Sequence, residues 1–159
     1  MNQPINDIYS DKRFEAATSN GGGKYAMPGF YPKAKITGVK NISTQDGPAV
    51  VVEYDILESS VPECPPGNGY GYVMKAKHAS FFSNVRRVIG ELTGDDFEKV
   101  DRDVCRGVTS QAQPLAGTLV SLTARQKKTK TGGAFTVHLF GLIEKSAALK
   151  ALEAAPPTA

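Results

Sequence analysis

Two different spacings of apolar residues follow one another along this chain, and their order limits the folds that it can adopt. In "AVVVEYDILE" (49–58), apolar residues alternate with acidic ones, which is typical of a β-strand with one buried face. In "SFFSNVRRVIGELTG" (80–94), apolar residues recur every three or four positions, which predicts an amphipathic helix with Ser80 as N-cap and Gly94 as its end. Alternation predicts four more strands, at 30–41, 70–77, 116–125 and 134–144.

The expected order is therefore three strands, one main helix at about 80–92, and two strands. This is the order of the OB-fold, a five-stranded, partly open barrel that binds oligonucleotides with its second and third strands and with two of its loops. We predict a mainly β OB-fold nucleic-acid-binding domain at 28–144, with the main helix between strands three and four. A flexible N-terminal arm (1–27) precedes it, and a short helix with a disordered tail (145–159) follows.

Two finer expectations concern the segments after the helix. The acidic stretch from 95 to about 114 has no clear period and is expected to be a solvated, irregular loop. On the fifth strand, the alternation places the apolar residues Phe135, Val137, Leu139 and Ile143 on one face, which we expect to be buried. His138 falls on the opposite face and is expected at the surface.

Charge is distributed unevenly along the 159 residues, although the net charge of +3 is small. Every charged residue between Lys40 and Lys75 is acidic, whereas no acid occurs between Asp103 and Glu144. The link between the fourth and fifth strands holds the densest positive charge, with Arg125, Lys127, Lys128 and Lys130. Such segregation predicts one positive and one negative surface, which would orient a polyanion on the protein.

Binding single strands without sequence preference requires cations along the backbone path and flat rings on which bases stack. The candidate rings are Tyr70 and Tyr72, which share one face of a strand beside Gly71, together with Phe135 and Tyr31. The alternative for any of these rings is a place in the core, and the alternative for the lysine-rich link is a hairpin tip protected against edge pairing. The candidate cations are Lys33, Lys35, Lys40, Lys75, Lys77, Arg125, Lys127, Lys128 and Lys130.

Four segments make the chain similar to the small phage-encoded OB-fold single-stranded DNA-binding proteins. They are "PGFYPKAKITGVKN", "AVVVEYDIL", "FFSNVRRVIGELTGDD" and "LAGTLVSLTARQKKTKTGGAFTVHLF", which together span about residues 28 to 143. The resemblance implies a protein that coats and protects single-stranded DNA without strong sequence preference during phage-type replication or recombination. Its partners would be single-stranded DNA or RNA, replication or recombination proteins, and further copies of the chain.

Other classes of function have weaker support in the sequence. "NGGGKY" lacks the spacing of a phosphate-binding loop, and Cys64, His78, Cys105 and His138 lack the spacing of metal ligands, so no enzyme activity, metal or cofactor is expected. The alternative function is a structural or adaptor protein of a virion, with the barrel as a scaffold. No signal-peptide pattern and no 18-residue apolar run occur, which predicts a cytoplasmic protein, in the bacterial host if a phage encodes it.

Overall fold

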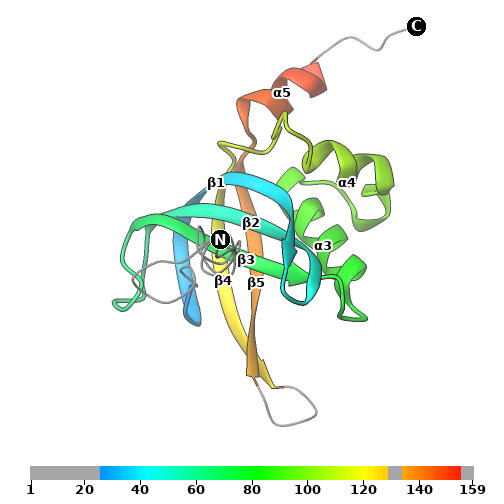
Figure 1. The fold of residues 1–159 in the computed structure, drawn as a ribbon. Helices are drawn as coiled ribbons and strands as arrows, with labels where there is room; N and C mark the ends of the chain where they lie inside the picture. The colour runs from blue at the N-terminus through cyan, green and yellow to red at the C-terminus, as the bar shows by residue number, and fades with distance from the viewer. Residues whose placement is uncertain (1–25, 129–133, 155–159) are drawn as a thin grey trace, which may run out of the picture.

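The structure, a computed structural model, describes residues 26–128 and 134–154, and in them one antiparallel sheet is the main element (Figure 1). Its strands are β1 (Gly29–Thr44), β2 (Gly47–Glu58), β3 (Gly67–Lys75), β4 (Leu119–Lys128) and β5 (Ala134–Glu144). The helices are α3 (Phe81–Thr93), the short 3₁₀ helix η1 (Phe97–Lys99), α4 (Arg102–Val108) and α5 (Ala147–Ala154). The prediction of a mainly β protein with five strands is confirmed.

The strands lie side by side in the order β3-β2-β1-β4-β5, so β1 is central. From Lys33 to Thr44 β1 pairs with β2, and its first residues, from Gly29 to Lys35, pair with β4. Its register with β2 shifts between Lys33 and Ala34 and again between Ile36 and Gly38, and such irregularities increase the local bend of a strand. The sheet therefore curves around a core instead of lying flat.

The expected barrel is not closed, because among the described residues β3 and β5 form no ladder with each other. Side chains of α3 occupy the free edge of β5 instead. Nη2 of Arg87 donates to the carbonyl of His138 at 3.1 Å, and the amide of Phe140 donates to Oε1 of Glu91 at 2.9 Å. We call the gap between β3 and β5, lined by Tyr72, His138, Arg87 and Glu91, the seam.

The placement of the helices also differs from the expectation of one main helix between the third and fourth strands. That connection contains α3, η1 and α4, and α4 lies in the acidic stretch that was expected to be a loop. Asp101 makes this possible, because its side chain accepts a hydrogen bond from the amide of Val104 at 2.9 Å and caps α4. Ser80 precedes α3 without a capping side-chain bond. No helix in the described ranges is long and apolar enough to span a membrane.

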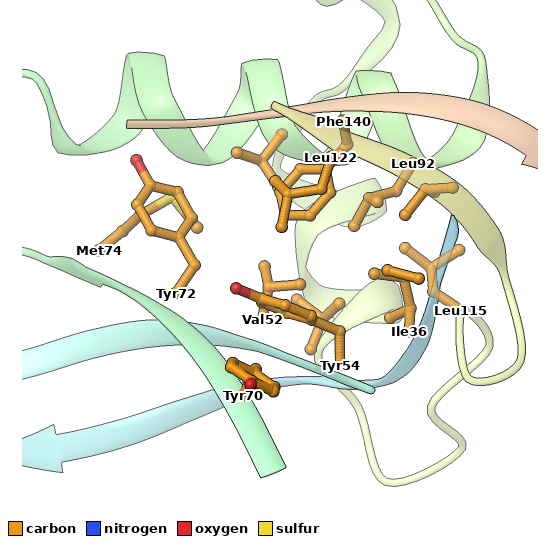
Figure 2. Packing of buried hydrophobic residues seen from close by; sticks show 14 of the residues in the cluster. Ile36, Val52, Tyr54, Tyr70, Tyr72, Met74, Leu92, Leu115, Leu122 and Phe140 are labelled. Carbon is orange, nitrogen blue, oxygen red and sulfur yellow. The ribbon is translucent and has the colours of Figure 1, made fainter. Parts of the chain in front are cut away.

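The core lies inside the curved sheet and beneath α3 (Figure 2). The expectation that His138 lies at the surface is wrong, because His138 is only 1% exposed and Phe140, on the same face, 5%. On the face that was expected to be buried, Val137 is buried but Ile143 is 51% exposed. Both faces of this strand are rich in apolar residues, so alternation alone could not choose between them. Pairing with β4 decides it, because Phe140 lies opposite Leu122 and His138 opposite Ala124, both of which are buried.

Candidate nucleic-acid interface

The β4–β5 hairpin carries exposed cations away from the core. Its ladder continues as far as the pair Lys128 and Ala134, and Figure 1 shows the hairpin projecting beyond the rest of the sheet. The side chains of Arg125 and Lys127 are exposed, and in the ranges that the structure covers neither forms an ion pair. Lys130 and the side chain of Lys128 lie outside the described part of the chain. The described cations of this hairpin are thus available to a ligand.

A second group of cations, at the end of β3, lies beside the β1–β2 turn and is already partly neutralised. Nζ of Lys75 and Nζ of Lys77 lie 2.8 and 3.3 Å from Oδ2 of Asp46. The hydrogen bonds from Lys75 and then Lys77 hold the pKa of the Asp46 carboxyl below its usual value. One carboxylate shared by two ammonium groups leaves about one net positive charge at this turn.

The remaining predicted cations, on β1, are separated from the hairpin tip. Lys35 pairs with Leu119, the first residue of β4, whereas Lys127 lies near the other end of that strand. Eight residues of strand correspond to roughly 26 Å. Lys33 lies close enough to Glu144 to help lower the pKa of that carboxyl, after the larger effect of Lys150. The predicted cations therefore form three groups and not one patch, and Lys40 is paired with Glu53 at 2.8 Å.

The predicted stacking platform is in the core. Tyr70 and Tyr72 do share a face of β3, but they are only 6% and 8% exposed, and their rings point into the interior (Figure 2). Tyr70 stacks on Tyr54 at 5.9 Å between ring centroids, and Tyr72 stacks on His138 at 4.3 Å. Tyr31 is fully buried as well. None of these rings is accessible to a base. For Phe135 only the backbone is described, opposite Lys127.

His138, expected at the surface, is the centre of the seam. Its Nε2 lies 2.8 Å from the hydroxyl of Tyr54, while its Nδ1 has no hydrogen-bond partner among the described residues. Burial, with a smaller contribution from the Arg87 guanidinium, lowers the pKa of His138 to about 4. The imidazole is therefore neutral at neutral pH, because its charged form would lose its hydration in this buried site.

A cavity of about 700 Å³ lies between the β1–β2 hairpin, α3 and α4. Its lining includes Phe81 and Phe82 from α3 and Arg102, Cys105 and Arg106 from α4. The sequence patterns did not reveal this site, because no helix was expected between 95 and 114. One signal was present, an N-cap aspartate at position 101. Phe82 gave none, because its spacing groups it with the apolar residues of α3 that are buried.

Comparisons with protein-family models, with curated proteins and with solved structures find no match for this chain. Within 26–128 and 134–154, no cluster of three or more His, Cys, Asp or Glu side chains is arranged to hold a metal ion. The proposal for function therefore depends on the geometry of the surfaces described above.

Proposed function

We propose that this protein binds the sugar–phosphate backbone of single-stranded nucleic acid, without reading the base sequence. The observation that carries the proposal is the projecting β4–β5 hairpin, where the exposed side chains of Arg125 and Lys127 have no acidic partner in the described residues. Cations that are free of internal ion pairs bind phosphates at a lower cost, since no protein contact has to be broken first.

The architecture supports the same proposal. An open, five-stranded sheet whose fourth and fifth strands are joined by a basic stretch of sequence is similar to the partly open barrel of the OB type, in which the loop between those strands contacts the oligonucleotide. Together with the resemblance to phage single-stranded DNA-binding proteins, it favours a protein that coats single-stranded DNA during phage-type replication or recombination. Because Tyr70 and Tyr72 are buried, this proposal covers the contacts with phosphates and assigns no base stacking to these two rings.

The test is a salt titration. Binding of fluorescein-labelled oligo-dT, followed by anisotropy at several NaCl concentrations, should give a log affinity that falls linearly with log salt. Each phosphate contact contributes about −0.7 to that slope for single strands, so the double variant Arg125→Gln/Lys127→Gln should flatten it by about 1.4.

The matched control is Lys145→Gln/Lys150→Gln, which removes the same charge from residues engaged with Glu153 and Glu144 at the other end of β5. The control should bind with an unchanged slope. Equal effects of the two double variants would mean that only net charge matters, and would exclude a hairpin-specific interface. If the wild-type protein binds neither oligo-dT nor oligo-rU at low salt, the result would instead favour the scaffold role in a virion.

A further inference from the structure

The cavity between α3 and α4 has an exposed ring at its edge. Phe82 is 74% exposed, more than any other large hydrophobic side chain in the described residues. Phe81 supports it edge-on, with 4.9 Å between the ring centroids and 66° between the ring planes. The ring of Phe82 is thus held in place from one side while most of its surface contacts solvent, which is the arrangement that a base-stacking residue needs.

The charges around this cavity are mainly positive. Its charged lining residues are three arginines, Arg86, Arg102 and Arg106, and one acid, Asp101. Asp101 is engaged as the cap of α4, and Arg86 is held by the carbonyls of Val100 and Phe97. Arg102 forms no ion pair in the described ranges, and the 3.4 Å pair of Arg106 with Asp103 is highly exposed and therefore weak. Two guanidinium groups are thus available to phosphates.

This cavity also follows directly on a basic part of the surface. Lys75, the last residue of β3, and Lys77 contact Asp46 of the β1–β2 turn, and the chain continues from them into the first turn of α3, which carries Phe82. Asn41 and Val50 of the β1–β2 hairpin line the cavity too. A strand that lies along this turn would therefore meet Phe82 next.

We propose that a nucleotide of the bound single strand enters this cavity, where its base stacks on Phe82 and its neighbouring phosphates contact Arg102 and Arg106. The inference rests on the proposed function and adds to it the stacking site that the buried tyrosines of β3 do not supply. The apolar lining residues, which include Phe81, Val85 and Val100, accept the face of any base. The site therefore requires no particular nucleotide sequence.

The absence of tryptophan from the sequence allows a direct test. Phe82→Trp keeps a ring at the cavity and introduces the sole tryptophan of the protein, whose emission should be quenched when oligo-dT stacks on it. Leu152→Trp, at a 65% exposed position on α5, is the matched control and should show no quenching. Phe82→Ala should lose affinity by roughly 5- to 150-fold, the range expected for one base–ring stack, with an unchanged melting temperature.

The outcomes separate the two proposals. If wild-type protein binds oligo-dT but Phe82→Trp shows no quenching and Phe82→Ala binds normally, the strand does not enter the cavity; the proposed function survives, and an apolar peptide becomes the better candidate ligand. Binding that is lost only in Arg125→Gln/Lys127→Gln would exclude the cavity in the same way. A wild-type protein without affinity for single strands overturns both proposals.

Discussion

The β4–β5 hairpin and the seam share strand β5, yet the charged residues of the two regions, on β4 and on α3, have opposite surroundings. At the hairpin, Arg125 and Lys127 extend into solvent and contact no acid in the described residues. At the seam, His138 and Tyr72 are buried against each other, and Arg87 and Glu91 are joined both to each other and to the backbone of β5. Charge that forms no internal contact is available for binding, whereas the polar groups of the seam stabilise the fold.

The largest effect that would test this comparison is expected from Tyr72→Ala. Truncating a buried aromatic residue leaves a cavity and should lower the free energy of unfolding by about 3 to 5 kcal/mol. Here it also removes the ring that stacks on His138. Urea denaturation measures the loss. Tyr72→Phe keeps the ring and should retain most of the stability. A normal unfolding midpoint for Tyr72→Ala would show that the ring is not part of the core. Tyr72 would then again be a candidate for base stacking.

A smaller effect is expected from acid, through His138. Its pKa of about 4 in the folded protein is below the ordinary value of 6.5, so the native state favours the neutral imidazole. The resulting stability is complete above pH 6.5 and is lost as the pH falls toward 4, by about 3 kcal/mol in total. The carboxyl groups of Asp46 and Glu144, with pKa values below their usual range, contribute losses of their own only at the acidic end of this window.

Urea denaturation between pH 7 and pH 4.5 would measure this dependence. His138→Gln can still bond to Tyr54 but does not titrate, so its stability should vary less with pH than that of the wild type. Parallel pH profiles for the two proteins would mean that another group causes the acid sensitivity. They would also mean that burial does not lower the pKa of His138.

The smallest effect on stability is expected at the hairpin. Arg125→Gln/Lys127→Gln removes no contact that the structure describes, so the free energy of unfolding should change by less than about 0.5 kcal/mol while the salt dependence of binding changes. Thermal and urea melts of the same samples used for binding provide the measurement. A loss of more than about 1 kcal/mol would show that these side chains stabilise the fold, and would remove the contrast with the seam.

The sequence predicts the local elements well and the long-range contacts poorly. Alternation around Val52 and Tyr54 identifies β2, and the helical spacing that includes Val85 and Leu92 identifies α3, because each pattern is produced by one element packing on the core. Alternation also shows that Tyr70 and Tyr72 share a face. It cannot show which side of the sheet that face lies on, since a tyrosine ring is apolar enough for the core and polar enough for a binding surface.

The seam and the cavity depend on residues that are distant in the sequence. His138 is buried because β3 and α3 approach β5, and no pattern within β5 records that approach. Arg87 and Glu91 have the spacing of an ordinary exposed helix pair, which gives no sign that they also bind the backbone of a strand. Phe82 could be recognised as exposed only once α4 was known to form the other wall of the cavity beside it.

The bond between Phe140 and Glu91 has a consequence for local motion. The Phe140 amide is held by a side chain of α3 and not by a neighbouring strand. An amide hydrogen exchanges with solvent only when its hydrogen bond opens. The Phe140 amide can therefore exchange whenever α3 separates from the sheet, even while the ladder between β4 and β5 stays intact. Its exchange rate, compared with that of the ladder amides, would therefore measure how often α3 detaches from β5 in the native protein.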